Sequence, residues 1–307
     1  MIREAPRPPR GCFTAAHGDK PHELDHYAPP ETAAGMTVTD EANLDAYLAR
    51  INYAGSIAPT LDTLETVHRL HPQAIPFENL NPMMELPVRL QLSDLEQKML
   101  VERRGGYCFE HNLLLKAVLE SMEFPVTPLA AGVLWGQPEG YEPPLNHMLL
   151  LVDVGGSPFI ADVGFGGQVA TAPLRLKADI EQTTPHERYR LLGGYPKWRL
   201  ESEIAGAWAP LYEFTLAPRT IEDYVAMNDA MMAAFHDDLR AARVDGGKRH
   251  GLRNARLRTH ENGETTTRVL TSIAEIRDVL ASIIGIQLPD TDRLEPALER
   301  ALQRDPD

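Results

Sequence analysis

The spacing of apolar residues changes near Pro125, and this change constrains the fold more than any other feature of the sequence. Before Pro125, apolar side chains recur every three or four residues, as in LDAYLARI (44–51), which is the spacing of an amphipathic helix. After it, short apolar runs such as HMLLLVDV (147–154) stand between Gly, Pro and Ser, a pattern typical of antiparallel strands. The sequence therefore predicts an α+β protein.

Three successive regions follow from this pattern. We expect a helical domain over residues 36–122, a β-barrel domain over 123–220 and an α/β region over 221–307, which ends in a polar tail after Pro289. The last region is predicted to contain a helix over 221–242, an alternating strand over 252–260 and a helix over 273–284.

Capping and breaking residues indicate the other helices of the first region. A second helix is expected after Pro59-Thr60. Ser93 to Glu96 matches a capping box that opens a third helix, and Gly105 is expected to end it. A fourth helix is predicted to begin near Cys108.

Residues 1–35 are rich in proline and show no apolar periodicity. We expect a disordered extension here, or a start assigned too far upstream, with Met36 as the first residue. HELDH (22–26) matches a zinc-binding pattern, but Pro21 and Pro29-Pro30 leave barely two helical turns and no third ligand is near. The stretch is interpreted as solvated, and no metal site is predicted.

The composition limits the partners and the compartment. A net charge of −14 argues against nucleic acid or an anionic membrane surface as the main partner. No run approaches about 18 apolar residues, and the N-terminus lacks the apolar core of a signal peptide. The two cysteines, Cys12 and Cys108, make no disulfide framework. A cytoplasmic protein is therefore expected.

The stretch RRGGYCFEHN (103–112) places Cys108 between a Gly-Gly break and a helical run. At the first turn of a helix, the unpaired N–H groups and the helix dipole favour a thiolate. This is a suitable position for a nucleophile. A buried structural cysteine is the alternative that these residues leave open.

Two neighbouring strands indicate a base for this nucleophile. His147 opens the first strand, and the turn 155–157 joins it to FIADV (159–163). If the strands pair across this turn, opposed residue numbers sum to about 311 or 313, and Asp162 shares a face with His147. A carboxylate within an apolar run needs a partner. A solvated histidine and a turn aspartate form the alternative.

Other catalytic signatures are missing from the sequence. GFGGQV (164–169) lacks the third glycine of a dinucleotide loop. No P-loop, C-x-x-C or G-x-S-x-G motif occurs. The constellation that remains is a cysteine, a histidine and an aspartate.

At these residues the sequence resembles the arylamine N-acetyltransferase family. The matching stretches are IPFENL (75–80), RRGGYCFEHN (103–112), NHMLLLV (146–152), DVGFGG (162–167) and APLRL (172–176), with weaker agreement at 44–51 and 239–244. The resemblance runs from about Met36 to Pro289. It implies a papain-like cysteine-protease core made of a helical bundle, a β-barrel and an α/β lid.

The resemblance also implies roles for individual residues. Cys108 is the acyl-accepting nucleophile, His147 its base and Asp162 the residue that holds the imidazole. Structural support for the cysteine loop is expected from Arg104, Glu78 and Asn81. An apolar acceptor pocket is expected from Phe77, Val133, Phe165 and Phe235, for each of which ordinary core packing is the alternative.

The activity implied by the resemblance is ping-pong acetyl transfer, of the kind used in xenobiotic metabolism. Acetyl-coenzyme A is the co-substrate, no cofactor is bound permanently, and arylamines, arylhydroxylamines or hydrazines accept the acetyl group. A monomer or a weak homodimer is expected. Part of the basic segment 240–258 is a candidate for contact with the coenzyme A phosphates, and a solvated hairpin face is its other interpretation.

Three other functions stay open from the sequence: a cysteine peptidase, an amide-forming acyltransferase with a longer or bulkier acyl donor, and a non-catalytic binder of coenzyme A or aromatic ligands. One departure from the family favours an unusual donor. The segment from Asn228 to Phe235 is shorter than in many relatives and carries Met231-Met232 in place of small hydroxyl residues. We expect weaker use of acetyl-coenzyme A, and either a more open cleft or tolerance of longer acyl chains. The alternative is that neighbouring loops fill the gap and donor use is ordinary. The physiological acceptor is not indicated.

Overall fold

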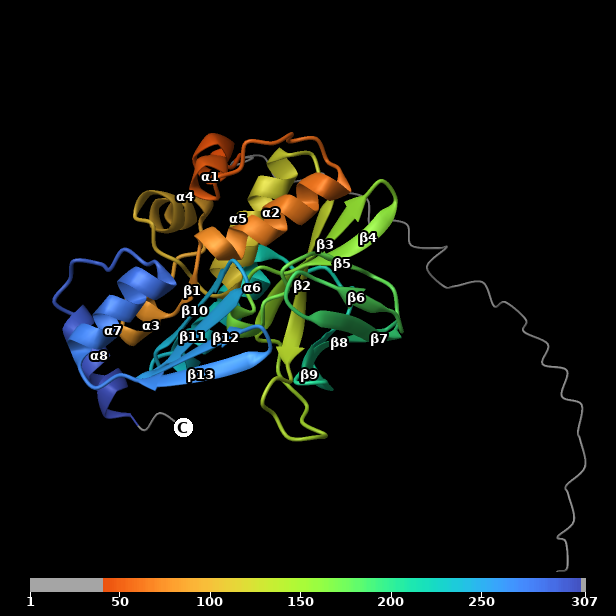
Figure 1. The fold of residues 1–307 in the computed structure, drawn as a ribbon. Helices are drawn as coiled ribbons and strands as arrows, with labels where there is room; N and C mark the ends of the chain where they lie inside the picture. The colour runs from red at the N-terminus through yellow and green to blue at the C-terminus, as the bar shows by residue number, and fades with distance from the viewer. Residues whose placement is uncertain (1–40, 305–307) are drawn as a thin grey trace, which may run out of the picture. The chain divides into compact units, whose positions relative to one another are not determined.

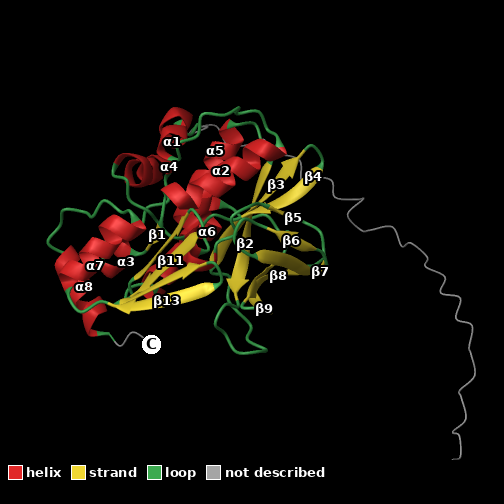
Figure 2. Ribbon diagram, in the orientation of Figure 1, coloured by secondary structure: helices red, strands yellow, loops and turns green. Residues whose placement is uncertain are grey.

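Helices occupy the first part of the chain in this computed structural model, which describes residues 41–304 (Figures 1 and 2). The extension predicted over 1–35, the HELDH stretch and the start expected at Met36 lie outside the described residues. The predicted starts of three helices are confirmed. These helices are α1 (Leu44–Arg50), α2 (Leu61–Ala74, capped by Thr60) and α5 (Cys108–Ser121).

The third predicted helix is wrong at both ends. α4 spans Leu92–Glu96, so Ser93 lies inside the helix and is not its cap. The carbonyl of Gln91 already accepts the first N–H groups of the helix, over 3.0 Å, without help from a capping side chain. A π-helical turn (Gln97–Val101) follows, and the left-handed backbone of Arg103 (φ 52°) lies beyond it. The chain therefore leaves the helix before Gly105.

An antiparallel sheet of eight strands fills the middle of the chain (Figure 2). Its two edge strands lie close together and are joined by two hydrogen bonds of the Gln182 side chain. This side chain accepts the Arg175 N–H over 2.7 Å and donates to the Arg175 carbonyl over 3.0 Å. The sheet thus nearly closes into a barrel, as the predicted fold class requires. Its order is β5 (Leu174–Arg175), β4 (Ser157–Ala161), β3 (His147–Val154), β2 (Val126–Val133), β9 (Ala207–Phe214), β8 (Lys197–Ile204), β7 (Arg188–Gly194) and β6 (Glu181–Thr183).

The β3–β4 hairpin fixes the register that matters for the site. Leu150 pairs with Ala161, so opposed residue numbers sum to 311, which is one of the two predicted values. Gly155 and Gly156 form the turn with positive φ angles of 60° and 84°, which glycine adopts without strain. Asp162 then follows directly after β4.

A second sheet combines distant parts of the chain. Its order is β1 (Phe77–Glu78), β10 (Arg240–Asp245), β11 (Lys248–Arg253), β12 (Arg256–Glu261) and β13 (Glu264–Val269). β1 comes from the helical region and precedes the short helix α3 (Leu80–Met83). The strand next to the cysteine loop is therefore held by hydrogen bonds to the C-terminal region.

The helix predicted over 221–242 is wrong in its second half. α6 spans Ile221–Ala234, and residues 240–245 form a strand instead. The Asn79 side chain donates to the Phe235 and Asp238 carbonyls and accepts the Arg240 N–H. Pairing of β10 with β1 and β11 thus overrides the helical propensity of LRAAR.

The single strand predicted over 252–260 is wrong as well, because a tight turn divides it. β11 ends at Arg253 and β12 begins at Arg256, and these two residues oppose each other. Asn254 occupies the left-handed region (φ 52°), which asparagine tolerates better than most residues. The asparagine was the available sign of this turn.

The chain ends in a helix where a polar tail was predicted. The helix predicted over 273–284 is present as α7 (Ile273–Asp278) and a π-helical turn (Val279–Ile284). Beyond Pro289, α8 (Leu294–Gln303) buries Leu294, Ala297, Leu298 and Ala301 against α7 and α3. These residues have helical spacing, but the two alanines make the apolar stripe inconspicuous.

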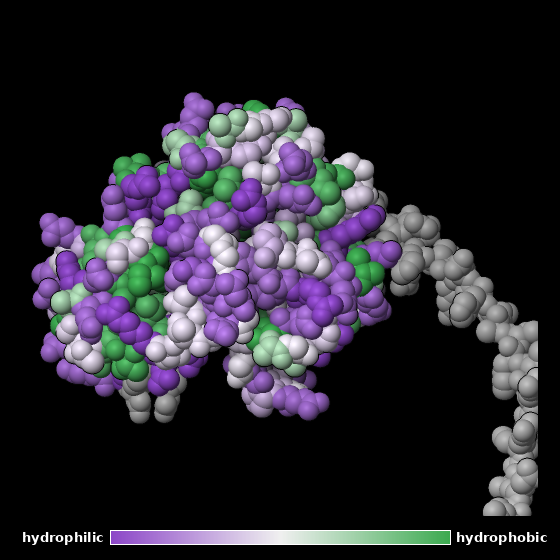
Figure 3. All heavy atoms as spheres, viewed as in Figure 1, coloured by the Kyte–Doolittle hydropathy of each residue, from purple (hydrophilic) through white to green (hydrophobic). Residues whose placement is uncertain are grey.

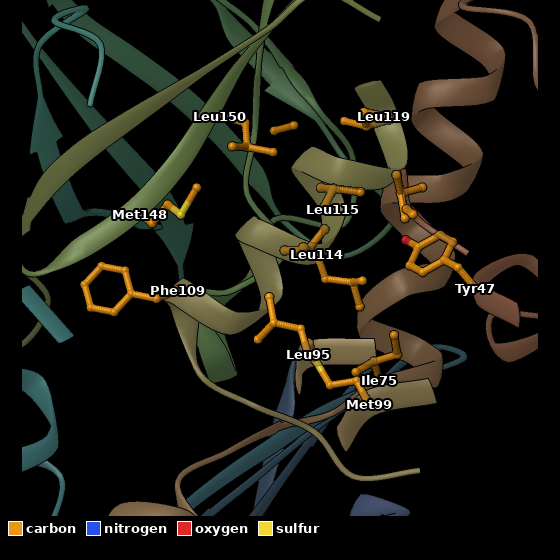
Figure 4. Close-up of a cluster of buried hydrophobic side chains, with 14 of the residues drawn as sticks. Tyr47, Ile75, Leu95, Met99, Phe109, Leu114, Leu115, Leu119, Met148 and Leu150 are labelled. Atoms are coloured by element: carbon orange, nitrogen blue, oxygen red, sulfur yellow. The ribbon is translucent and has the colours of Figure 1, made fainter. Parts of the chain in front are cut away.

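The main hydrophobic core lies between the first helices and the barrel. Side chains of α1, α4 and α5, such as Tyr47, Leu95 and Leu115, lie in one cluster with Met148 and Leu150 of β3 (Figure 4). On the face in Figure 3, hydrophilic side chains predominate, with hydrophobic ones in small groups between them. Among residues 41–304, the helices are all too short or too polar to cross a membrane.

Candidate active site

The cysteine loop is built on a close approach of two backbones. A Cβ atom on Gly105 would lie 1.8 Å from the Pro76 carbonyl oxygen, so a larger residue does not fit. Gly106 bridges to Phe77, and its carbonyl accepts the Glu78 N–H over 2.8 Å. The glycine pair therefore serves to seat the loop against β1.

Cys108 is the first residue of α5, as the sequence predicted. Its side chain is buried, with 5% of the residue exposed, and its Sγ lies 4.0 Å from the Asn146 carbonyl oxygen. A Cβ on Gly164 would lie 2.7 Å from the Cys108 Cα. The DVGFGG segment thus passes directly over the start of the helix.

His147 and Asp162 form a buried pair. His147 Nε2 lies 2.7 Å from Asp162 Oδ2. Burial alone would lower the pKa of His147, but the charge and hydrogen bond of Asp162, aided by Cys108, raise this pKa to about 10. Burial would likewise raise the pKa of Asp162, yet His147 and the N–H donors around the carboxylate hold it below its usual range. An ionised pair is therefore favoured.

Asn112 holds this carboxylate, and sequence reasoning missed it. Its Nδ2 donates to Asp162 Oδ1 over 3.0 Å and to the Met148 carbonyl over 2.7 Å, while its Oδ1 accepts the Val163 N–H. The Gly164 N–H also donates to Asp162 Oδ1. Asn112 lies one turn beyond Cys108 on the same face of α5, and that spacing was the available signal.

A buried network of charges lies beside the cysteine loop and includes Arg104 and Glu78, from which structural support of this loop is expected. Arg104 donates to Glu78 Oε1 over 2.7 and 3.1 Å. Lys98, which the sequence analysis missed, lies 2.7 Å from Glu110 Oε1 and 3.7 Å from Glu78 Oε1. Glu110 accepts the Tyr107 N–H at the start of α5. Opposed charges thus alternate beneath the nucleophile.

Asn81 is placed outside this network. Its Nδ2 donates to the Pro87 carbonyl over 2.9 Å. Asn79 instead links the PFENLN segment to the stretch between α6 and β10. Asn79 and Asn81 are two residues apart where β1 ends and α3 begins, and their side chains therefore lie on different sides of the chain.

The four predicted pocket residues lie in two groups. The Phe77 and Phe235 rings are 6.4 Å apart, and Phe235 also contacts the Tyr107 ring at 5.5 Å. Phe165 packs edge-on against His147 at 5.0 Å and contacts Tyr212 at 5.1 Å. Val133 is paired with this same tyrosine across the sheet. Tyr212 is a further aromatic neighbour of the imidazole that sequence reasoning missed.

Three further histidines are buried between α2 and α5. The hydroxyl of Tyr47 lies 2.8 Å from His71 Nδ1, and His71 Nε2 lies 2.8 Å from His111 Nδ1. His111 Nε2 lies 3.2 Å from the Pro76 carbonyl, which only accepts, so each N–H or O–H points along this chain toward Pro76. His68 is the third and contacts Asp162.

The segment expected as shortened turns is the C-terminal half of α6. Met231 and Met232 are half-buried and pack against the main core. Asn228 accepts a hydrogen bond from the Tyr107 hydroxyl and donates to the Val88 carbonyl. The helix is therefore attached to the residue next to Cys108.

The basic segment 240–258 is mostly paired within the protein. Arg240 and Arg253 lie against Asp238, Lys248 against Glu261, and Arg249 against Glu187. Arg243 donates to the Gln73 carbonyl. Within the described part of the chain, Arg256 and Arg258 are the basic residues of this segment whose guanidinium groups have no hydrogen-bond or ion-pair partner, although their backbones pair within the sheet.

Comparison with known proteins places this geometry in a family. A family model described as N-acetyltransferase matches residues 60–293. The arylamine N-acetyltransferase of Mycobacterium tuberculosis is 38% identical over 277 residues, covering 86% of this chain and 97% of that protein. A more distant relative, 28% identical over 256 residues (79% of this chain, 97% of that protein), is the Proansamycin X synthase of Amycolatopsis mediterranei.

Solved structures agree with these sequence matches. The arylamine N-acetyltransferase of M. smegmatis superposes with a TM-score of 0.81 at 36% identity, covering 85% of this chain and 99% of that one. The Mycobacterium marinum enzyme in complex with CoA gives a TM-score of 0.81 at 36% identity, covering 84% and 99%. The chain described here belongs to the arylamine N-acetyltransferase family.

Proposed function

We propose that this chain transfers an acetyl group from acetyl-coenzyme A to arylamines, arylhydroxylamines or hydrazines through an acetyl-cysteine on Cys108. The observation that carries the proposal is the pairing of His147 with Asp162 next to a cysteine at a helix start. Membership of the family and the CoA complex of a relative support the same donor and acceptors. No permanently bound cofactor enters this scheme.

The first half-reaction forms the acyl-enzyme. With His147 Nε2 bonded to Asp162, Nδ1 is the nitrogen left for the Cys108 thiol. The protonated ring holds the proton that the thiol has given up, and the thiolate attacks the thioester carbonyl. The bond between the acyl carbon and the coenzyme A sulfur breaks, and the leaving sulfur takes the proton back from His147.

The second half-reaction regenerates the thiolate. A neutral amine nitrogen attacks the acetyl-cysteine, His147 accepts the proton that the nitrogen loses, and Cys108 leaves as a thiolate. Arylamines are neutral near pH 7, so an apolar pocket made by Phe77, Val133, Phe165 and Phe235 suits them without an anionic anchor.

Mass spectrometry tests the acyl-enzyme directly. We expect acetyl-coenzyme A, without acceptor, to add one acetyl group to the protein, and Cys108→Ala or Cys108→Ser to abolish both this adduct and amine acetylation. Cys12→Ala, the same change at the other cysteine, is the matched control and keeps both. Acetylation of arylamines by Cys108→Ala would refute the proposal. A peptidase-like enzyme would instead hydrolyse its acyl group without an amine.

A bulkier acyl donor is the second candidate, and the apolar side chains in the segment from Asn228 to Phe235 favour it. The half-buried methionines 231 and 232 offer a pliable apolar wall on α6. A panel of acetyl-, propionyl- and longer acyl-coenzyme A thioesters, compared by the rate of Cys108 acylation, separates the two. Preference for acetyl-coenzyme A with an ordinary Michaelis constant would exclude the second candidate. Coenzyme A binding without any acylation would indicate a non-catalytic binder.

A further inference from the structure

A buried histidine that takes no part in the proposed reaction lies behind Asp162. His68, in the middle of α2, is fully buried, and its Nε2 accepts the Asp162 main-chain N–H over 3.1 Å. The carboxylate of Asp162 is held by other groups, namely Asn112, Gly164 and His147. His68 therefore fixes the backbone of this residue, separately from its side chain.

This hydrogen bond leaves the other ring nitrogen with a proton that has no partner in the described part of the chain, which is unfavourable in the core. That indicates that a histidine occupies this position because its Nε2 accepts the Asp162 N–H. Because Nε2 accepts, the ring proton lies on Nδ1, and Nδ1 has no partner among the described residues. A buried donor without a hydrogen-bond partner is destabilising. A leucine would fill the same space in the core, but it would leave the buried Asp162 N–H without an acceptor.

The local helix carries a second unfavourable feature. Pro72 lies four residues after His68 within α2, so the His68 carbonyl lacks the N–H that would normally bond it. Pro72 and Val163 line the same small cavity, so this part of the helix lies against the chain just after Asp162. Unfavourable local features such as these two occur most often at functional sites.

His68 is suited to accept at neutral pH. Burial lowers its pKa to about 4, and the nearby Asp162 charge opposes this only in part. The ring is therefore neutral in the working range. His71, on the same helix, and Asp162 are its titratable neighbours, and His71 is held neutral by burial too.

We propose that His68 is a positioning residue, whose Nε2 fixes the Asp162 main chain so that the carboxylate meets His147. The inference rests on the proposed function in that Cys108 and His147 must act as a pair. In this proposal, the hydrogen bond with His68 of α2 positions Asp162, and through Asp162 it positions His147 next to Cys108.

Two amides test which atom of His68 matters. In a Cys12→Ala background, His68→Gln places an acceptor near the position of Nε2, whereas His68→Asn places it near that of Nδ1. The rate of Cys108 alkylation by iodoacetamide is measured against pH, together with the thermal midpoint. The matched control is His71→Gln, an identical change at a buried histidine of the same helix.

We expect His68→Gln to keep the wild-type pH profile of alkylation. His68→Asn should move half-maximal alkylation to higher pH by about one unit and slow acylation about tenfold, because His147 loses its aligned carboxylate. His71→Gln should lower the thermal midpoint and leave the profile unchanged. Equal profiles for the glutamine and asparagine variants, or a shifted profile for His71→Gln, would overturn the assignment.

The test remains separate from that of the proposed function. Iodoacetamide reports the state of Cys108 without any acyl donor, so the His68 comparison stands even if acetyl-coenzyme A leaves the wild-type protein unmodified. That latter result would refute acetyl transfer alone. A wild-type profile in His68→Asn, with normal acylation, would refute the role of His68 alone.

Discussion

Asp162 is the residue whose charge does most for the imidazole. Asp162→Asn keeps the shape of the side chain but removes the charge that raises the pKa of His147, and its amide can stabilise the wrong ring tautomer. We expect amine acetylation to fall by about 10³–10⁴-fold, and the thermal midpoint to fall as well because the buried pair with His147 loses its charge. Asp153→Asn is the matched control, because Asp153 lies in the same hairpin and bonds only the Gly156 N–H at the turn. Near wild-type turnover by Asp162→Asn would show that Asp162 has no part in catalysis and only belongs to the turn.

Whether the partner of a site residue could be predicted depended on how far apart the two residues lie in the sequence. His147 and Asp162 are 15 residues apart in one hairpin, so alternation and the glycine turn were sufficient to place them together. His68 and Asn79 meet their partners across 94 and 161 residues, and no local pattern records such contacts. Glu110 is buried although it is charged, and its partners there are the Tyr107 N–H and Lys98, which lies twelve residues away in the sequence.

At the scale of elements, the junction of β1 with the cysteine loop leaves no room for a side chain. Gly105→Ala would bring Cβ to 1.8 Å from the Pro76 carbonyl, a backbone atom that cannot rotate away. We expect a loss of about 1–3 kcal/mol in unfolding free energy and a fall in acylation rate, because the loop must move. Gly247→Ala, where Cβ meets no atom within 4 Å, should change neither. Urea unfolding and acylation of both variants decide the matter.

The elements that sequence reasoning placed wrongly share a physical cause. Residues 240–245 have helical propensity, yet they pair with β1 and β11, partners that lie far away or beyond a turn. α8 was hidden because alanines carry half of its buried stripe. Helices with strong periodicity or a clear cap, such as α2 and α5, were predictable because their signals are local.

At the scale of the whole molecule, buried histidines make stability depend on pH in two opposite ways. Burial lowers the pKa values of His68 and His111 to about 4 and that of His71 well below 6.5. The unfolded chain therefore binds more protons than the folded one below pH 6.5, and stability falls as the pH drops from there toward 4. His147 acts oppositely, because its pKa is raised to about 10 and its stabilising contribution is lost as the pH rises from 6.5 through 10.

We therefore expect the unfolding free energy to be greatest near neutral pH. It should fall more steeply on the acid limb of its pH profile than on the alkaline limb. Each buried neutral histidine contributes up to about 1.4 kcal/mol per pH unit on the acid limb, so unfolding free energies from urea titrations at pH 5, 6, 7, 8 and 9 should resolve the slope. His111→Gln should make the acid limb shallower, since one proton fewer is taken up on unfolding. An acid limb of equal slope in His111→Gln would mean that His111 is already protonated in the folded protein, against the donor order Tyr47, His71, His111 that ends at the Pro76 carbonyl.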